Sequence, residues 1–341
     1  MFTPIGQFRD GDSTGLNYKA SRAARQVLRT RNSPISSASP AESIKPAILL
    51  TVDVEDWFQV ENFKRSISFS SWSSQELRVE KNTHCLLDHL DLNNGRYING
   101  HEQGKKRQAT FFILGWIAKR LPHLVREIYS RGHEVASHGY YHNLCAQLSH
   151  EDLKRDLVNS KKLLEDILGK RVFGYRAPGF SINDAILKII EDTGYSYDSS
   201  FNSFSMNKRY GQLELSGNGK KGIAFQVSDS FYELPISNIA LGKKTLPWGG
   251  GGYFRLTPFR LFYLGVQSIL KKQKAYLFYM HPWEIDPEQP KVKNVSSFYR
   301  FRHYLNLSKT HSRLSKFLEI FNQCHFVTCR HYLKEMMESS V

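Results

Sequence analysis

The stretch AILLTVDVEDWF (residues 47–58) decides the fold class, because an apolar run in it ends directly in three carboxylates. A short continuous run of this kind is typical of a strand that is buried on both faces, as in a parallel sheet, and it predicts a strand at AILLTVDV (47–54). Further strands are predicted at ATFFILG (109–115), HEVAS (133–137), VFGYR (172–176) and AYLFYM (275–280). Aromatic and β-branched residues support these predictions.

Segments with helical periodicity separate these strands. WIAKRLPHLVREIYSRG (116–132) carries apolar residues on one face and ends in glycine, so it is predicted to be a single helix. Ser149 followed by Asp152 predicts the capped start of a helix that ends at Gly169. The alternation of strands and helices predicts an α/β fold with a parallel sheet, either open and doubly wound or closed into a barrel.

Composition and charge narrow the class of partner. The chain has 341 residues, of which 40% are hydrophobic and 23% charged, an ordinary balance for a globular protein. Its formal net charge of +15 suits a nucleic acid, an anionic lipid surface or an acidic polymer. No nucleic-acid-binding motif is present, so we expect no nucleic acid partner, whereas peripheral membrane contact stays open. Residues 1–45 are rich in Ser, Arg and Ala and are predicted to be a disordered or extended tail.

The cysteines and the apolar runs bear on the compartment. The four cysteines have spacings that match neither a zinc knuckle nor a compact disulfide framework, which favours a reducing environment. No stretch approaches the ~18 apolar residues of a membrane span. The N-terminal MFTPIGQFRDGD lacks the pattern of a secretory signal. We therefore expect a cytoplasmic protein without a transmembrane segment.

Polar residues occur where the predicted strands end. Asp53 ends the first strand, and His138 lies just past the third. Arg176 ends the fourth strand, and His281 immediately follows AYLFYM. In parallel α/β barrels the carboxyl ends of the strands form one rim, where active sites lie. These four side chains are therefore expected to converge.

Two histidines indicate a metal site. His138 and His142 have the i, i+4 spacing that can place two imidazoles on one side of a helical turn. Such a site needs an anionic ligand, and Asp53, Glu55 and Asp56 supply carboxylates at one strand end. Two histidines and one carboxylate leave coordination positions open, which predicts a catalytic site for one divalent metal ion. Zinc is expected from the ligand types, with cobalt, nickel and manganese as alternatives.

Six segments occur in a fixed order along the chain: TVDVEDWF, RQATFFILGWIAKR, HEVASHGYYH, GYRAPGFSI, YSYDSS and LFYMHPWEIDP. This series resembles the motifs of the NodB-homology polysaccharide deacetylases, carbohydrate esterase family four. Four segments resemble the subgroup found with exopolysaccharide and exosortase systems: DVEDWF (53–58), GGGGYFRL (249–256), HPWEIDPEQP (281–290) and FYRFRHYLNL (298–307). The resemblance implies an irregular (β/α) barrel over residues 46–333, including a family-specific extension from about 285, followed by a tail at 334–341.

The resemblance also implies roles for the residues at the strand ends. Asp53 matches the general base that takes a proton from the attacking water, and His138 and His142 match the two metal-binding histidines. Arg176, in an R-x-P pattern with Pro178, matches the arginine that orients the catalytic aspartate.

Two residues of later motifs complete the expected machinery. His281 matches the late histidine that acts as general acid on the leaving amine. Asp198 matches an aspartate motif associated with holding that histidine.

The first motif departs from the common pattern of the family. The family usually has two adjacent aspartates here, and the second is a metal ligand. In this chain Val54 follows Asp53 in place of that second aspartate, so the ligand is Glu55 or Asp56. Alternation along an extended strand keeps residues i and i+2 on one face, which favours Glu55 beside Asp53. Asp56 stays open as a ligand if the chain turns there.

The expected substrate follows from the resemblance. We expect removal of N-acetyl groups from an acetylated oligo- or polysaccharide, or from a lipid-linked precursor of it, in exopolysaccharide biosynthesis. Backbone N–H groups near Tyr140 or at the glycine run that includes Gly251 are candidates for stabilising an oxyanion, and Trp283 is a candidate pocket wall. The alternatives are a related metal-dependent amidase acting on a small cyclic amide, and an inactive homologue that binds carbohydrate.

Overall fold

The computed structural model describes residues 45–91, 96–98, 101–103, 106–204, 210–215, 219–242 and 244–338. The described residues all belong to one compact unit, Lys45–Val341. The predicted N-terminal tail, residues 1–45, lies outside the described residues apart from Lys45. Among the described residues, no helix has both the length and the apolar character that a membrane crossing requires.

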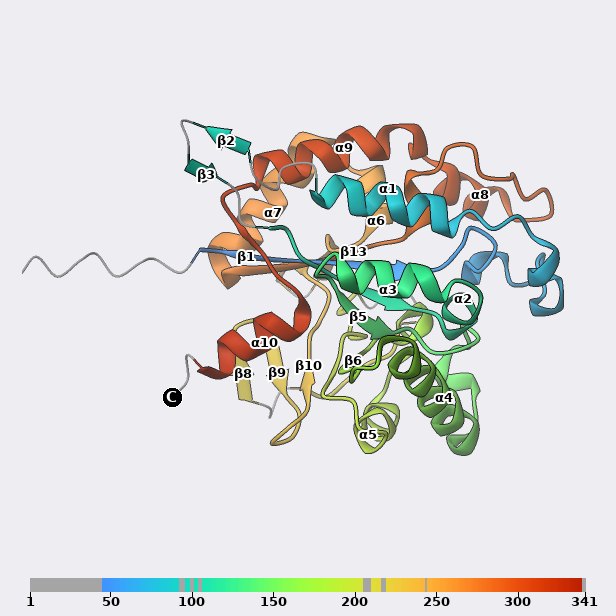
Figure 1. Cartoon of the computed structure of the whole chain (residues 1–341). Coiled ribbons are helices and arrows are strands. Elements are labelled where there is room, and N and C mark those ends of the chain that lie inside the picture. Colours follow the sequence, from blue (N-terminus) through green and yellow to red (C-terminus); the bar gives the residue numbers. More distant parts are fainter. Residues whose placement is uncertain are drawn as a thin grey trace, which may run out of the picture. The chain divides into compact units, whose positions relative to one another are not determined.

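A mixed sheet lies at the centre of this unit (Figure 1). Its strands are β1 (Ala47–Val54), β4 (Ala109–Ile113), β5 (Glu134–Ser137), β6 (Gly174–Tyr175), β7 (Tyr197–Asp198), β8 (Gly219–Lys221), β9 (Ala224–Gln226), β10 (Tyr232–Glu233), β13 (Ala275–Met280) and β14 (His325–Phe326). Two hairpins lie apart from it, β2 (Arg96–Ile98) with β3 (His101–Gln103) and β11 (Asn238–Leu241) with β12 (Lys244–Pro247).

The order of the strands decides which strand ends meet. The order is β13-β1-β4-β5-β6-β7-β10-β9-β8, with β14 paired to β1. Strands from β13 to β10 pair in parallel, and β9 and β8 continue the sheet antiparallel. The sheet forms a half-barrel, so the predicted α/β fold of the irregular (β/α) barrel type is confirmed.

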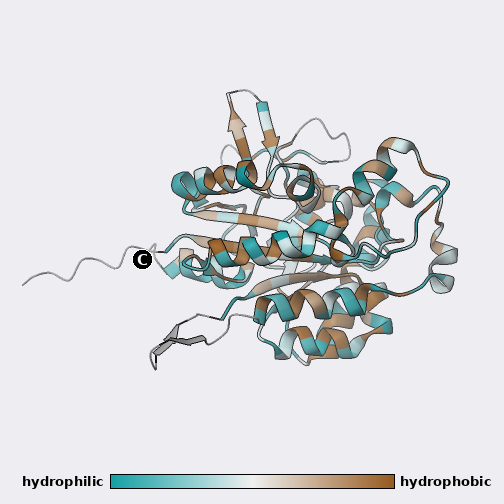
Figure 2. Cartoon of the chain, turned by 90° about the horizontal axis from the view of Figure 1, so that it is seen from above, coloured by the Kyte–Doolittle hydropathy of each residue, from teal (hydrophilic) through white to brown (hydrophobic). Residues whose placement is uncertain are grey.

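Helices lie around this sheet and mix hydrophilic with hydrophobic residues along their length (Figure 2). They are α1 (Val79–Asp91), α2 (Gly115–Arg120), α3 (Pro122–Ser130), α4 (His150–Leu168), α5 (Asp184–Asp192), α6 (Gly251–Leu256), α7 (Phe259–Gln273), α8 (Ser297–Tyr304), α9 (Leu307–Ile320) and α10 (Cys329–Glu338). The caps predicted for α4 are confirmed. Ser149 accepts a hydrogen bond from the backbone N–H of Asp152, and Gly169 ends the helix with a φ of 64°.

Two predicted boundaries differ from the structure. The single helix predicted over 116–132 is wrong, because the segment forms α2 and α3 with a break at Leu121. Pro122 has no backbone N–H to donate within a helix, so it begins α3 instead of continuing α2. The tail predicted at 334–341 begins inside α10, which continues to Glu338.

The side chains of strand β1 alternate between two hydrophobic clusters, and this alternation decides which side of the sheet its polar residues face. Ile48, Leu50 and Val52 pack in the cluster that includes the surrounding helices, whereas Leu49 packs in a second cluster with residues of β4, β5 and β13. Because side chains alternate along a strand, Asp53 lies on the same side as Leu49. The strand thus directs its apolar residues into two cores and its last polar residues into one of them.

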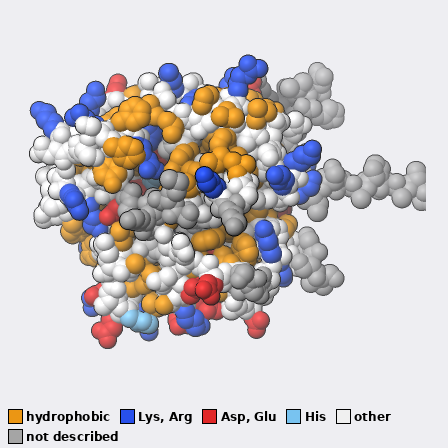
Figure 3. Space-filling model, turned by 180° about the vertical axis from the view of Figure 1, so that it is seen from behind, with side chains coloured by type: hydrophobic (Ala, Val, Ile, Leu, Met, Phe, Trp, Pro, Cys, Tyr) orange, Lys and Arg blue, Asp and Glu red, His pale blue; other side chains and the backbone are white. Residues whose placement is uncertain are grey.

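The surface seen from behind carries patches of hydrophobic side chains between lysines and arginines (Figure 3). Exposed apolar side chains among the described residues include Leu261 and Leu264 on α7 and Phe298 and Phe301 on α8. Peripheral contact with a membrane stays a prediction.

A candidate metal centre and active site at the strand ends

The parallel strands bring the predicted polar residues to one pocket. Asp53 belongs to β1, His138 follows β5, and His281 follows β13. A pocket of about 110 Å³ is lined by these three side chains together with Glu55 and His142. Arg176, directly after β6, lies behind the pocket wall and contacts Asp53 there. The convergence follows from the parallel register, because each residue continues a strand at the same edge of the sheet.

Three buried side chains form a candidate metal centre. Glu55, His138 and His142 each offer one ligand atom, and these atoms lie within 4.8 Å of one another. The Nε2 atom of His142 lies 3.4 Å from Glu55 Oε2, and that of His138 lies 3.7 Å from Glu55 Oε1. Burial alone would raise the pKa of Glu55, but the positive charges of His142 and His281 outweigh it and hold this pKa well below its usual value.

The hydrogen bonds of His138 fit a metal ligand. Its Nδ1 lies 2.8 Å from the backbone carbonyl oxygen of Arg176, so Nδ1 carries the proton and donates it. Its Nε2 is then an acceptor, and it is buried without a hydrogen-bond partner among the described residues. An unpartnered buried acceptor beside a carboxylate is costly. A divalent cation held by Glu55, His138 and His142 would satisfy both groups, with the carbonyl orienting the ring from behind.

The i, i+4 spacing of His138 and His142 was interpreted as one helical turn, but the turn that carries them is not helical. Gly139 has a φ of 73° and His142 a φ of 55°, both in the left-handed region. Asp156 of α4 accepts a hydrogen bond of 2.8 Å from the backbone N–H of Tyr140. That N–H is therefore committed to Asp156, and Tyr140 is a poor candidate for stabilising an oxyanion.

Asp56 lies outside the candidate metal centre. Its carboxylate accepts backbone hydrogen bonds from Trp57, Arg78 and Val79 at 2.7–2.8 Å. Burial raises the pKa of Asp56 to about 6, against the lowering effect of these bonds. The chain turns directly after Glu55, which points Asp56 at the beginning of α1. The geometry thus assigns the carboxylate of the cluster to Glu55 and gives Asp56 a role at the start of the helix.

Asp53 and Arg176 form a buried ion pair. Arg176 Nη1 donates to Asp53 Oδ1 at 2.7 Å and to the hydroxyl of Thr51 at the same distance. The other side of the guanidinium donates to the backbone oxygen and the hydroxyl of Ser199. Arg176 is fully buried, so its position is set by these acceptors. It therefore holds Asp53 in one orientation through a charge-assisted hydrogen bond.

His281 is held by a residue that the sequence did not single out. Glu284, in the 3-10 helix η5 (Pro282–Ile285), lies 2.8 Å from His281 Nδ1 and accepts the backbone N–H of His281. Arg255 of α6 donates to the other oxygen of Glu284 at 2.8 Å. Burial would raise the pKa of Glu284, but Arg255 and His281 lower it to about 2. The local signal was present in HPWE (281–284), where a glutamate three residues after the histidine completes a capping box.

The charge around His281 suits a general acid. Burial alone would lower its pKa, but Glu55 and Glu284 raise it well above the usual value. Its Nε2 lies 3.1 Å from Glu55 and 4.0 Å from Asp53, and its side chain is 18% exposed. The imidazolium therefore faces the carboxylates of the pocket and remains accessible to a ligand.

Asp198 does not hold His281 as expected. Its carboxylate accepts hydrogen bonds from the hydroxyl and the backbone N–H of Ser200, at 2.7 and 3.0 Å. Its acidic neighbour is Glu233 on β10, whose pKa is raised well above its usual value by burial and by the charge of Asp198. Asp198 thus orders the strand ends behind Arg176, while Glu284 contacts the histidine.

The three remaining predicted residues lie at or near the pocket in different ways. Trp283 lines it, and its ring stacks on His281 with centroids 5.1 Å apart. Pro178 begins the short helix η4 (Pro178–Phe180) between two residues that line the pocket. Gly251 packs against Glu284, because a Cβ there would lie 2.2 Å from Glu284 Oε1. Its glycine is explained by this close approach rather than by contact with a substrate.

Residues 103–197 match the family model described as polysaccharide deacetylase, and residues 199–334 match the model of a domain of unknown function (DUF3473). Over residues 103–197 the chain is thus similar to the polysaccharide deacetylase family. Membership of the exopolysaccharide and exosortase subgroup stays a prediction.

Two curated relatives show similarity over part of the chain. The peptidoglycan-N-acetylglucosamine deacetylase of Bacillus cereus is 37% identical over 90 residues, which cover 26% of this chain and 42% of the relative. The peptidoglycan deacetylase-like protein FGM2 of Gibberella zeae is 32% identical over 206 residues, covering 58% of this chain and 57% of the relative. The chain thus spans about half the length of the curated relatives it matches.

A solved structure shares the fold of this chain. It comes from Mycobacterium smegmatis and is provisionally described as a polysaccharide deacetylase. It has a TM-score of 0.57 at 18% identity and covers 89% of this chain and 94% of that chain. The likeness supports the fold alone.

Acidification is expected to destabilise the protein through His303, which packs against the pocket residue Trp283. Its ring stacks on Trp283 at 4.2 Å, and its Nε2 donates to Gln289 at 2.6 Å. Burial, and then the charge of Arg255, lower the pKa of His303 to about 3. The unfolded chain, with a histidine pKa of about 6.5, therefore binds a proton that the folded chain excludes, and stability falls as the pH falls from about 6.5 to about 3.

Urea unfolding of the wild type and of His303→Asn at about pH 7 and about pH 5 measures this effect. The wild type is expected to lose about 2 kcal/mol more than the variant over this interval. An equal loss in both proteins would show that His303 does not carry the pH dependence.

Proposed function

We propose that this protein is a metal-dependent hydrolase that removes N-acetyl groups from an acetylated sugar polymer or its precursor, in exopolysaccharide biosynthesis. The observation that carries the proposal is the juxtaposition of Glu55, His138 and His142 with the Asp53–Arg176 pair and His281 in one pocket. The names of its relatives, which are peptidoglycan, chitin and chitooligosaccharide deacetylases, support the same substrate class.

Glu55, His138 and His142 would hold the metal ion, and their buried donor atoms fit it. When bound, a divalent cation supplies Lewis acidity that polarises the amide carbonyl and lowers the pKa of water. Zinc is proposed from the two imidazoles and one carboxylate, with cobalt, nickel and manganese as alternatives.

Asp53 and His281 would move the protons of the reaction. Asp53, oriented by its hydrogen bond from Arg176, accepts a proton from the attacking water as the oxygen of that water forms a bond to the acetyl carbon. His281 then donates a proton to the amine nitrogen as the carbon–nitrogen bond breaks, so that acetate and a free amine leave. Glu284 keeps the donating Nε2 directed into the pocket by binding Nδ1.

Aromatic side chains favour a sugar as the group that enters. Trp283, Phe180, Tyr210 and Tyr279 line the pocket beside the charged residues. Aromatic faces stack on the apolar faces of sugar rings, while the carboxylates and histidines act on the acetamido group. The cytoplasmic location and the lipid-linked form of the substrate remain predictions from the sequence.

Acetate release tests the proposal directly. The metal-replete full chain is incubated with defined N-acetylglucosamine oligomers, acetylated exopolysaccharide fragments and small cyclic amides, and acetate or ring-opened product is measured. Acetate release from an acetylated glycan, lost on chelation and restored by metal, is the expected result. Hydrolysis of cyclic amides alone would overturn the substrate class, and glycan binding without hydrolysis would indicate a carbohydrate-binding homologue.

Glu284→Gln is expected to lower kcat by about 10- to 100-fold with little change in KM, short of the 10²- to 10⁴-fold of a complete general acid. The neutral amide no longer holds the imidazolium, so the pKa of His281 falls and the alkaline limb of the pH–rate profile moves to lower pH. Glu288→Gln, at an exposed carboxylate nearby, is the matched control. A normal pH–rate profile in Glu284→Gln would show that Glu284 does not support His281 as the general acid.

A further inference from the structure

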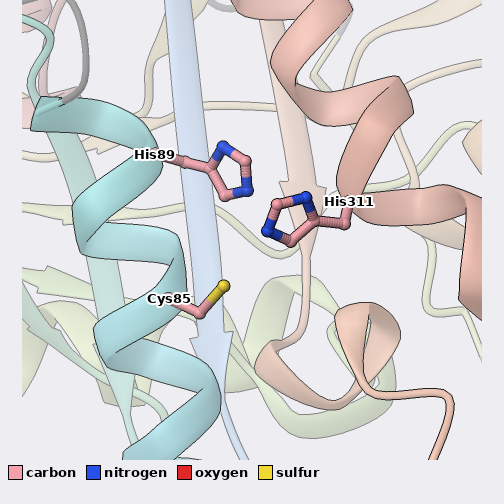
Figure 4. Close-up of side chains that lie close together, drawn as sticks. All are labelled: Cys85, His89 and His311. Atoms are coloured by element: carbon pink, nitrogen blue, oxygen red, sulfur yellow. The ribbon is translucent and has the colours of Figure 1, made fainter.

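A second group of metal-binding side chains lies between two helices, separate from the pocket. Cys85 and His89 lie one turn apart on α1, and both project towards His311 of α9 (Figure 4). One ligand atom from each lies within 4.8 Å of the others. The rings of His89 and His311 meet edge to face with centroids 4.1 Å apart. Neither the fold nor the proposed reaction explains this convergence.

The hydrogen bonds of His89 direct a lone pair into the group. Ser315 donates its hydroxyl proton to the backbone oxygen of His311 at 3.2 Å. Its oxygen, 3.3 Å from His89 Nδ1, must therefore accept there, so Nδ1 carries the proton of the ring. His89 is only 3% exposed, and its Nε2 is buried with no hydrogen-bond partner among the described residues. This unprotonated nitrogen is available as a ligand, with Ser315 orienting the ring.

We propose that Cys85, His89 and His311 form a second metal site, which takes Zn²⁺. Imidazole and thiolate are ligands that zinc prefers, and zinc binds them at about 2.0–2.3 Å, so small side-chain rotations bring the three atoms together around it. Binding releases the thiol proton of Cys85 to solvent and leaves a fourth position for water. His311 is exposed, so the cation reaches the site from the surface.

The place of the site in the fold suggests a structural clip. Helices α1 and α9 contact each other, and both contact η5, the turn that follows His281. Arg313 of α9 donates to the backbone oxygen of Arg255, which in turn binds Glu284. A cation bound by both helices links the two elements that pack against η5. Zinc at this site is therefore expected to raise thermal stability without taking part in the reaction.

Cobalt titration of the full chain distinguishes this site from the pocket. A thiolate bound to Co²⁺ gives a charge-transfer absorption in the near ultraviolet, which the sulfur-free cluster of Glu55, His138 and His142 cannot give. We expect this band in the wild type and in His138→Ala. The band is expected to be lost in Cys85→Ser and in His311→Ala. His311 is exposed, so its removal disturbs folding least. Cys324→Ser, at another half-buried cysteine, is the matched control and keeps the band.

Thiol alkylation provides a readout on the unmodified chain. Zn²⁺ is expected to slow the alkylation of Cys85 but not of Cys324, as mapped by peptide mass spectrometry. A wild type that shows no charge-transfer band, or a band that survives in Cys85→Ser, overturns the proposal. Equal alkylation of Cys85 with and without Zn²⁺ overturns it too, and neither result bears on acetate release.

Discussion

Asp53→Asn is expected to lower kcat for acetate release by about 10²- to 10⁴-fold while the metal content of the pocket stays unchanged. The amide cannot accept the proton of the attacking water, but it keeps the size of the carboxylate and lies beside the cluster rather than within it. The buried guanidinium of Arg176 loses its anionic partner, so the free energy of unfolding falls by about 3–5 kcal/mol. Metal analysis, steady-state kinetics and urea unfolding on one preparation measure all three quantities.

Asp192→Asn, at an exposed carboxylate on α5, is the control for this experiment and should match the wild type. An Asp53→Asn enzyme with normal kcat would assign the base to another residue. A variant that loses the metal instead would place Asp53 among the ligands.

His138→Ala is expected to remove the metal ion from the pocket and reduce acetate release to background. Its Nε2 is the buried atom without a partner, so no other described group replaces it. The exposed His123→Ala serves as control and should keep one equivalent at this site. Equilibrium dialysis against zinc, followed by elemental analysis, gives the stoichiometry.

The same measurement decides between the two candidate carboxylates. Glu55→Gln should lose the metal as His138→Ala does, because Glu55 lies between the two histidines. Asp56→Asn should keep it and instead weaken the start of α1, whose N–H groups Asp56 binds. The opposite pattern would restore Asp56 as the ligand.

Much of the fold could be predicted because its strands are buried on both faces. AILLTVDV and AYLFYM form β1 and β13 with the predicted bounds, and both are continuous apolar runs. Helix α4 was predicted with both caps, because Ser149 and Gly169 act locally. The break at Pro122 was missed, since the apolar periodicity continues across it although the backbone cannot.

Which residues reach the rim follows from the order of strands in the sequence, because in a parallel sheet any residue that follows a strand arrives at the same edge. Asp53, His138, Arg176 and His281 meet there for that reason. What each of them contacts depends instead on how distant segments pack together. Arg255 and Glu284 are 29 positions apart and meet only because α6 packs beside η5.

The metal ligand and the partner of His281 show the same division. Alternation along β1 favoured Glu55, but the chain's turn after it, which commits Asp56 to α1, is visible only in three dimensions. Asp198 was expected beside His281, yet it lies behind Arg176 next to Ser200. Strand periodicity is a local property that the sequence carries, whereas the direction of a side chain at a strand end depends on distant segments that pack against it.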